Sequence, residues 1–316
     1  MDLPKVSVII VSYNGEKWIN ECIRSILRNN YGYSEIVVVD NASQDRTASI
    51  IQGNFREVIL LNQRKNIGFG RGANVGIQYA MSQKADYILL LNQDIKLDEH
   101  CIESMITVCE GKREIGIASP LQMNYAGSAV DAHFARLYGF KQGTGLAKKD
   151  VSMDSFEVDT VIGASMLIRS SVIEKIGGFD PLFFLYHEEG DLCRRARYHG
   201  VKIHIIPKAV VYHKHIQLAP EEMTFKAKLS STYGYYIYIL KNPFTPFRQN
   251  LNTMMRQMNK WMCRDRNIIK MARRLLINVA AGTVVLVKMP LIIRNRKDDR
   301  VSGKNLYLQQ GGQRRQ

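Results

Sequence analysis

The chain has 316 residues and a formal net charge of +15, with 46% hydrophobic and 23% charged residues. That length suits one large α/β core, or one domain with an appendage, and the composition excludes a disordered or fibrous protein. From Lys241 onward there are 17 Lys and Arg against 3 Asp, which leaves 27 basic and 26 acidic residues in the first 240. The basic character therefore belongs to the C-terminal part and not to the predicted core.

The cysteines, the first residues and the late apolar stretch indicate the cellular compartment of the protein. Five cysteines are scattered without a CxxC pair, so the pattern indicates neither a disulfide framework nor a zinc cluster. The start, Met1 to Pro4, lacks the basic residues and long apolar run of a secretory signal. The longest late apolar stretch, Leu275 to Val287, is shorter than the roughly 20 residues of a membrane-spanning helix. We expect a reduced, cytoplasmic protein.

Short apolar runs alternate with helical patterns through the first part of the chain. This alternation predicts a parallel sheet with right-handed crossovers, whose carboxyl edge binds ligands. Polar residues at that edge follow the second and fourth runs, at Asp40 and Asn92. The strands are expected at 6–11, 36–39, 58–61, 87–91 and 115–118, and the helices at 18–27, 44–52, 71–83 and 99–110.

The later elements are predicted with fewer signals. Residues 123–154 are rich in Gly, Ala and Lys and are expected to form a loop region beside a binding cleft. A strand is expected at 158–168, and a short helix at 170–176 that ends at Gly177. A tyrosine-rich helix follows Pro220 and runs to Leu240, and Pro243 and Pro246 mark a linker.

Two segments suit a nucleotide. Asp40 ends a strand, where its carboxylate could accept a hydrogen bond from the N–H of uracil or thymine; the alternative is that Asp40 or Ser43 caps the next helix. The segment from Asn66 to Asn74 brings glycines and Arg71 to a helix start, which suits an anionic ligand. It is not a dinucleotide fingerprint, because Ala73 stands where the third glycine belongs and no strand directly precedes it.

Two further segments carry carboxylates. Asp94, in Asn92-Gln93-Asp94, follows a strand and could supply an oxygen ligand to Mg²⁺ or Mn²⁺. Glu188, Glu189 and Asp191 fall within four residues beside an aromatic run. A partly buried carboxylate of this kind can act as a general base, whereas the alternative is an acidic helix N-terminus that complements the helix dipole. We favour a structural role for Asp191 and a catalytic role for Glu189.

In this order the four segments, with Val8 to Gly15 before them, resemble glycosyltransferase family 2 from about Val6 to His215. The segments 66–74 and 178–195 are similar to rhamnosyltransferase-type and related cell-surface polysaccharide enzymes. The resemblance implies a GT-A fold, a Rossmann-like, mostly parallel sheet flanked by helices. It implies a catalytic domain at 1–217, followed here by a basic helical extension at 218–305 and a disordered tail at 306–316.

The resemblance also implies an inverting, metal-dependent transfer of rhamnose or another hexose from a UDP- or dTDP-sugar. Glu189 would be the base, with Glu188 as the alternative. Asp191-Leu192 aligns with the Asp-Leu pair of the family pattern Glu-Asp-x-Asp-Leu, and this alignment places Glu189 at the position of the base. Asp94 and His213 would hold Mg²⁺ or Mn²⁺, and His215 is a rival for the second position. Two departures from the family pattern stand out: one carboxylate in Asn92-Gln93-Asp94, and Glu where Asp is usual at 189. The expected donor-binding residues are Ser12, Tyr13, Asn14, Asp40, Asn41, Ser43, Asn66, Gly68, Arg71, Asn74, Asn92 and Gln93.

Two other functions fit the same sheet less well than glycosyl transfer. A nucleotidyltransferase would use a similar sheet, but its Gly-rich, basic opening loop is missing after Val11. A catalytically dead module that only binds a nucleotide sugar is disfavoured because Asp94, Glu189 and His213 are all present.

The sequence of the C-terminal extension predicts a contact with a membrane surface. Between Ile268 and Ala280, apolar residues recur at helical spacing with Lys270, Arg273 and Arg274 between them. Such a helix suits an anionic membrane surface, here the inner face of the cytoplasmic membrane with a lipid-linked glycan acceptor. Packing on the catalytic domain is the alternative, and nucleic-acid binding is disfavoured. Residues 257–261 nearly match the QxxRW motif of processive synthases, but Lys260 replaces the Arg and no membrane-spanning helices are expected to follow. We therefore treat the match as chance and predict a single-addition enzyme.

Overall fold

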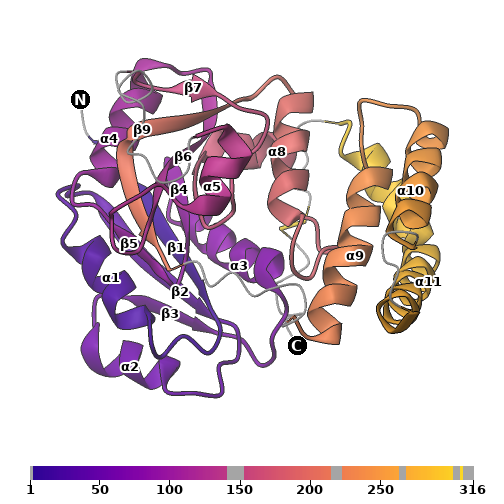
Figure 1. The fold of residues 1–316 in the computed structure, drawn as a ribbon. Helices are drawn as coiled ribbons and strands as arrows, with labels where there is room; N and C mark the ends of the chain where they lie inside the picture. Colours follow the sequence, from indigo (N-terminus) through magenta and orange to yellow (C-terminus); the bar gives the residue numbers. More distant parts are fainter. Residues whose placement is uncertain (1–2, 141–152, 215–222, 263–267, 302–306, 309–316) are drawn as a thin grey trace, which may run out of the picture.

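The computed structural model describes residues 3–140, 153–214, 223–262, 268–301 and 307–308. They form a twisted sheet with helices on both faces, and a group of three long helices packs beside it (Figure 1). The N-terminal strands lie at one side of the sheet, and the three C-terminal helices lie at the other end of the molecule.

The sheet combines parallel and antiparallel strands. Its strands are β1 (Val6–Ser12), β2 (Ser34–Asp40), β3 (Ile59–Asn62), β4 (Tyr87–Asn92), β5 (Ile95–Leu97), β6 (Ile115–Asn124), β7 (Phe156–Glu157), β8 (Ser165–Arg169) and β9 (Lys202–His213). Their order is β3-β2-β1-β4-β8-β6-β9-β5, and β7 pairs with β9. The pairs β1–β2, β1–β4, β2–β3 and β6–β9 are parallel, whereas β8 and β5 pair antiparallel with their neighbours.

Helices cover both faces of this sheet, which explains why β1 and β2 are apolar without alternation. One face packs against α1 (Ile19–Leu27), α2 (Thr47–Asn54) and α4 (Cys101–Gly111). The other packs against α3 (Phe69–Ser82), α5 (Ala132–Tyr138), α7 (Ser170–Ile176) and α8 (Glu188–Tyr198). In β1, for example, Val8 and Ile10 face the first group, and Ile9 faces the second.

The extension forms α9 (Phe225–Leu240), α10 (Phe247–Met262) and α11 (Ile268–Asp298). Its own apolar cluster joins Ile237, Met254 and Val285 from the three helices. Leu182 and Phe183, from the segment before α8, insert into the same cluster, so the extension packs directly on the catalytic part. Tyr307 and Leu308 are also buried, so these two residues of the predicted tail are ordered; residues 309–316 lie outside the described ones.

The expected α/β pattern is confirmed for the five strands expected up to residue 118, which are β1 to β4 and β6, and for the four helices between them, with differences at element ends. The short strand β5 was not expected. Two later predictions are wrong, and one long strand was not predicted. The strand expected at 158–168 is confined to Ser165–Arg169, and α5 lies in the region expected to be loop, of which 141–152 is outside the described residues. The long strand β9 was not predicted. It contains Pro207, which is unusual in a central strand, and a register shift in its pairing with β6 occurs next to this residue.

The last helix bears on the expected absence of a membrane span. The apolar stretch Leu275 to Val287 was expected to be too short, because Lys288 closes it. The helix that contains this stretch continues past Lys288 to Asp298. Met271–Asp298 is by length and composition long and apolar enough to cross a membrane.

Candidate active site

The carboxyl edge of the parallel strands gathers the first predicted residues. The strand register places Ser12 beside Asp40, Asp40 beside Asn62, and Val11 beside Asn92. Residues from four separate segments of the sequence are thus brought to one edge, where an open α/β sheet binds its ligands.

The loops after β1 and β2 are bonded to each other at this edge. Asp40 accepts hydrogen bonds from the hydroxyl of Ser43 and from its backbone N–H, at 3.1 Å. Ser43 Oγ accepts from the backbone N–H of Asn14 at 2.9 Å, and Asn14 Oδ1 accepts from that of Gln44 at 2.8 Å. The helix that follows begins only at Thr47, so neither Asp40 nor Ser43 caps it. Asn14 and Ala42 have φ of 50° and 64°, a left-handed conformation often found at functional sites.

Gln93 fixes the first loop to the fourth strand. Its Oε1 accepts from Ser12 Oγ at 2.6 Å and from the Tyr13 N–H at 3.0 Å, and its Nε2 donates to the Tyr13 carbonyl at 3.1 Å. A Cβ on Gly15 would overlap this amide and approach Ser12 Oγ to 2.9 Å. The loop therefore needs glycine at position 15.

The Gly-rich segment links the β2 end to the segment before α8. The Asn41 amide accepts from the Ile67 N–H at 3.0 Å and donates to the Gly68 carbonyl at 3.1 Å. Asn66 Oδ1 accepts from the Gly68 N–H at 2.9 Å. Gly68 has φ of +88°, and its Cα lies against the Phe184 carbonyl, where any Cβ would clash. Only glycine fits there.

Two predicted donor ligands of this segment have structural partners. Arg71 donates to the Pro181 carbonyl at 2.8 Å. The buried Asn74 amide bonds both backbone groups of Phe179, at 2.8 Å each. Their role in donor binding stays a prediction. In the structure, both side chains also bond to the backbone of the segment that leads to α8.

Asp94 and His213 face each other across two strands. Antiparallel pairing of β5 with β9 places Ile95 opposite His213, and His213 Nε2 lies 3.7 Å from Asp94 Oδ1. The imidazole is 7% exposed and the carboxylate 24%. His215, the rival, lies outside the described residues.

The fit of this pair to a divalent cation can be judged from the spacing. Bonds of about 2.1 Å to oxygen and nitrogen allow one ion to contact both atoms. The described residues contain no group of three or more His, Cys, Asp or Glu that could hold a metal. Mg²⁺ and Mn²⁺ are commonly held by few protein ligands together with substrate phosphates, so the pair fits such an ion.

The glutamates at the start of α8 differ in surroundings. Glu188 is 4% exposed, and its Oε2 has no hydrogen-bond partner within the described part of the chain. Glu189 packs over Gly163, where an added Cβ would lie 3.3 Å from its own. Burial raises the pKa of both carboxyls, and for Glu188 the neighbouring charge of Glu189 adds to the rise. Both side chains therefore bind a proton more readily than an ordinary exposed carboxylate, as a general base requires.

Glu189 lies near the end of β4. The Asn92 N–H donates to the Ala164 carbonyl at 2.9 Å, and Gly163, against which Glu189 packs, is the preceding residue.

Before α8, Tyr186 and His187 both have φ of 72°, so two non-glycine residues in succession adopt left-handed conformations. Such strain persists only where surrounding structure fixes it, and here it orients the first turn of α8.

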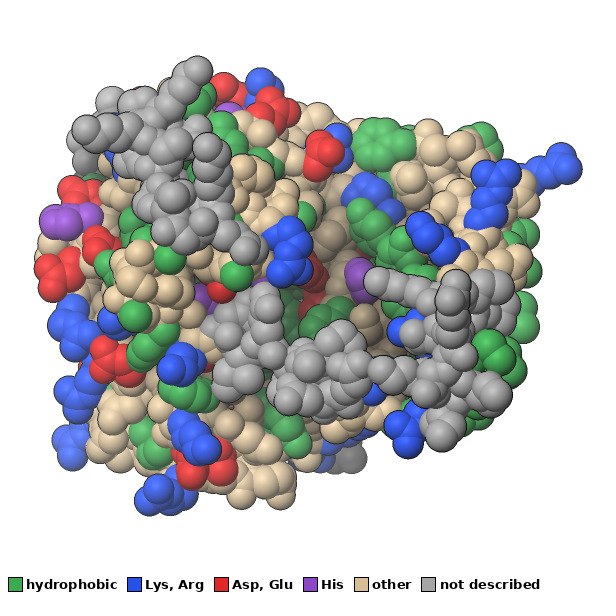
Figure 2. Space-filling view, in the orientation of Figure 1, with side chains coloured by type: hydrophobic (Ala, Val, Ile, Leu, Met, Phe, Trp, Pro, Cys, Tyr) green, Lys and Arg blue, Asp and Glu red, His purple; other side chains and the backbone are tan. Residues whose placement is uncertain are grey.

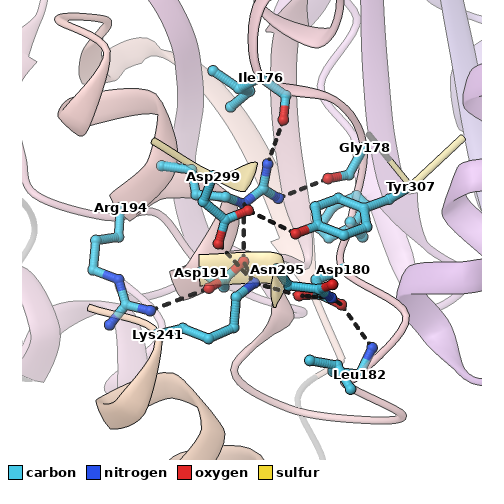
Figure 3. Close-up of polar contacts among 12 residues, drawn as sticks. Ile176, Gly178, Asp180, Leu182, Asp191, Arg194, Lys241, Asn295, Asp299 and Tyr307 are labelled. Carbon is cyan, nitrogen blue, oxygen red and sulfur yellow. Dashed lines mark hydrogen bonds and ion pairs between the residues drawn. The ribbon is translucent and has the colours of Figure 1, made fainter. Parts of the chain in front are cut away.

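A network of buried charges fixes the rest of α8 (Figure 3). Asp191 accepts from Arg195 Nε at 2.9 Å, from Arg194 at 3.1 Å and from Lys241 Nζ at 3.1 Å. Lys241, at the end of α9, also pairs with Asp180, and with Asp299 at 3.0 Å. The favoured structural role of Asp191 agrees with these contacts. Sequence reasoning missed the other members, because nothing in the sequence relates residues 50 to 115 positions apart.

A pocket of about 370 Å³ opens beside Gly190, the residue after Glu189. Its walls come from α8, α9, α10 and the turn between the last two. Figure 2 shows this face of the molecule hollowed near its middle, where acidic and histidine side chains lie recessed. The pocket offers guanidinium, aromatic and amide groups, among them those of Arg194, Arg197, Tyr238, Phe244 and Asn250.

The fold of the sheet with its flanking helices is that of the GT-A glycosyltransferases. The structure of S. aureus TarS in complex with UDP matches with a TM-score of 0.55 at 16% identity, covering 94% of this chain and 88% of that one. A structure solved with UDP, GalNAc and Mn²⁺ matches with a TM-score of 0.60 at 14% identity, covering 92% of this chain and 58% of that one. At such identities these matches show the fold alone.

The model of glycosyl transferase family 2 matches residues 7–177, and the chain belongs to this family. It is 29% identical over 204 residues to the hexosyltransferase Agl10 of Haloferax volcanii, covering 64% of each protein. It is 29% identical to rhamnosyltransferase WbbL of Escherichia coli, covering 73% of this chain and 92% of that one. Identity to dTDP-rhamnosyl transferase RfbF of Shigella flexneri is 25%, covering 66% and 68%. The protein is thus a glycosyltransferase, and the predicted family and fold are confirmed.

Proposed function

We propose that this glycosyltransferase moves rhamnose or another hexose, with inversion, from a dTDP- or UDP-sugar to a hydroxyl of a lipid-linked glycan. The relatives named for rhamnosyl transfer, one of them from dTDP-rhamnose, support the donor class. The GT-A neighbours solved with UDP and UDP-GlcNAc support a nucleotide diphosphate donor. The observation that carries the proposal is Glu189, a carboxylate of raised pKa beside the strand end that leads to Asp94.

In the proposed reaction Glu189 removes the proton from the acceptor hydroxyl as its oxygen attacks the anomeric carbon. The bond from that carbon to the diphosphate breaks on the opposite face, so the configuration inverts and the nucleotide diphosphate leaves. Burial of Glu189 makes it a stronger base than an ordinary carboxylate. The rigid first turn of α8 keeps the base in position, and such positioning supplies much of the rate enhancement.

Asp40 and Asp94 would contact different parts of the donor, Asp40 the base and Asp94 the metal ion at the diphosphate. Asp40 would accept the N–H of the uracil or thymine ring at the edge of the sheet. Ser43, whose hydroxyl accepts from the Asn14 N–H, would hold the Asp40 carboxylate in place. Asp94 and His213 would hold Mg²⁺ or Mn²⁺. When bound, the ion neutralises the charge that develops on the leaving diphosphate.

For the acceptor we propose the pocket beside Gly190. Aromatic faces and side-chain amides are the groups that contact the C–H and hydroxyl surfaces of sugars, and Phe244 is 54% exposed there. We place the enzyme at the inner face of the cytoplasmic membrane, supported by the basic, apolar α11.

A panel of dTDP-, UDP- and GDP-sugars, assayed with and without Mn²⁺, tests the function. A glycosyltransferase of this type slowly releases nucleoside diphosphate even without acceptor. We expect release from a dTDP- or UDP-sugar that requires metal, with no pyrophosphate formed. Release of pyrophosphate from a nucleoside triphosphate would instead show nucleotidyl transfer, and binding of donor without any release would show a dead module.

A further inference from the structure

One side of α11 is an unusually apolar surface. Leu286 and Val287 are 70% and 76% exposed, although such side chains normally avoid water. Others on the same helix are more than a third exposed, and contiguous apolar surface of this kind marks a binding site. The exposed residues include Leu275, Leu276, Val279, Leu286, Val287 and Leu291; we call them the α11 outer face.

The opposite side of α11 is buried against the protein. Ala281, Val285 and Ile292 are at most 1% exposed and pack in the cluster with α9 and α10. Asn278 accepts a hydrogen bond from the hydroxyl of Tyr236. Near the C-terminal end, Asn295 donates to Asp180 at 3.0 Å. These contacts span the length of the helix.

The buried side decides between two ways of meeting a bilayer. A helix that crosses the membrane would have to leave Tyr236, Asp180 and the apolar cluster, and would expose buried polar groups to lipid or water. A helix that lies in the membrane plane keeps them all, because only its outer face enters the lipid. Although α11 is long enough to span, its contacts therefore fit the in-plane orientation.

The charges around the outer face indicate which lipid it meets. From Ile268 to Lys297 the sequence contains no Asp or Glu. Arg273 precedes the apolar stretch, and Arg294 and Lys297 follow it, all three exposed. Lys288, in the middle, is turned inward toward the Leu182 carbonyl at 3.5 Å. In a helix that lies in the membrane plane, these cations can contact anionic headgroups of one leaflet while the apolar side chains between them enter its acyl boundary.

We infer that the α11 outer face docks in the plane of an anionic membrane surface as a monotopic anchor, without crossing the bilayer. The inference specifies the proposed membrane location and does not depend on the proposed donor or base. It also connects that location to the active site. Because α10 packs in the same cluster as α11 and contributes Asn250 to the pocket beside Gly190, docking would hold this pocket near the lipid surface.

The full-length protein should be tested by co-sedimentation with vesicles of phosphatidylcholine alone or mixed with phosphatidylglycerol. The test variant is Leu286→Asp with Val287→Asp, two exposed positions outside the packed cluster. The matched control is Leu27→Asp, on α1, where the leucine is 45% exposed. We expect wild type and control to bind the anionic vesicles, and the double variant to bind about tenfold or more weakly. Metal-dependent nucleotide release from the donor should be unchanged in all three.

Three kinds of result overturn the inference. Wild type that fails to sediment with anionic vesicles, or a double variant that still sediments, excludes this surface. A label attached at the C-terminal end of α11 that is accessible only from the far side of the vesicle bilayer shows a spanning helix. A dimer in solution that the double variant dissociates, without vesicle binding by wild type, assigns the surface to a second copy. Loss of nucleotide release in wild type would refute the proposed function but not the anchor.

Discussion

Lys241 Nζ lies 3.1 Å from Asp191 Oδ2, and neither side chain is exposed to solvent. The lysine ends the first helix of the extension, and the aspartate follows the glutamates in the first turn of α8. The lysine also contacts Asp180 and Asp299, so one ammonium group joins three parts of the chain. Burial alone would raise the pKa of Asp191, but Lys241, Arg195 and Arg194 outweigh it and hold that pKa well below its usual range. The extension is thus attached directly to the helix that carries the proposed base.

Replacement of Lys241 by methionine should destabilise the protein strongly. It would leave the carboxylates of Asp180 and Asp299 without their shared cation in a buried site, at a cost of about 3–5 kcal/mol. Chemical denaturation measures the change in the free energy of unfolding. The matched control is Lys202→Met, since Lys202 pairs with Glu157 at 3.6 Å with both side chains about half exposed, and a loss within about 1 kcal/mol is expected. Equal effects of the two variants would contradict the assigned role of the network.

Replacement of Glu189 by glutamine should abolish transfer without preventing donor binding. An amide cannot accept the acceptor's proton, and loss of a general base typically lowers the rate by about 10²–10⁴-fold. The comparison is Glu188→Gln, which alters the buried neighbour and should leave most of the turnover. Steady-state kinetics together with calorimetry of donor binding separate the two effects. If the Glu188 variant is the inactive one, the role of base moves to Glu188.

The pH dependence of activity should reflect the raised pKa of Glu189. Burial favours its protonated form, so the base is lost as pH falls through a value above the ordinary glutamate pKa of about 4.3. Activity should therefore decline on the acid side while neighbouring exposed carboxylates are still ionised. A profile of kcat/KM against pH measures this, and a decline that begins only below about pH 4.5 would show an unperturbed base.

Removal of either member of the Asp94–His213 pair should weaken the binding of Mn²⁺ together with nucleotide diphosphate. Each substitution to alanine removes one of the two protein ligands proposed for the ion, so we expect affinity to fall about tenfold or more. Calorimetry with dTDP or UDP and Mn²⁺ gives the change. The control is His100→Ala, because His100 is exposed and pairs only with nearby surface groups such as Glu103. Unchanged affinity in both site variants would place the metal elsewhere.

Replacement of Gly15 by alanine should impair donor binding while the protein stays folded. The new Cβ would displace the Gln93 amide, which holds the loop after β1 through Ser12 and Tyr13. We expect the KM for the donor to rise about tenfold, as for other losses of about 1.4 kcal/mol in binding. Gly53→Ala, at a helix position with open space around it, should leave donor binding unchanged. A normal KM in the Gly15 variant would show that this loop does not contact the donor.

The fold of the first part of the chain could be predicted from local pattern. Val6 to Ser12 is apolar throughout because both faces of its strand are covered, and Ile19, Cys22, Ile23 and Ile26 mark one face of the next helix. The order of the motifs was also enough to identify the family, because the spacing of Asp40, Asp94 and Glu189 along the chain does not depend on how it folds.

What the tertiary structure alone decided are the contacts between distant segments. The family resemblance had paired His213 with Asp94, but only the structure shows how they meet, through the pairing of β5 with β9. The structure showed Gln93, Asn74 and Arg71 bonded to backbone groups, which no residue type reveals in advance. It also placed Lys241 in a buried site with three aspartates, where the sequence shows only one cation among many in a basic region. The physical reason is the same in each case: a local pattern records which face of a helix or strand is buried, but not which distant segment covers it.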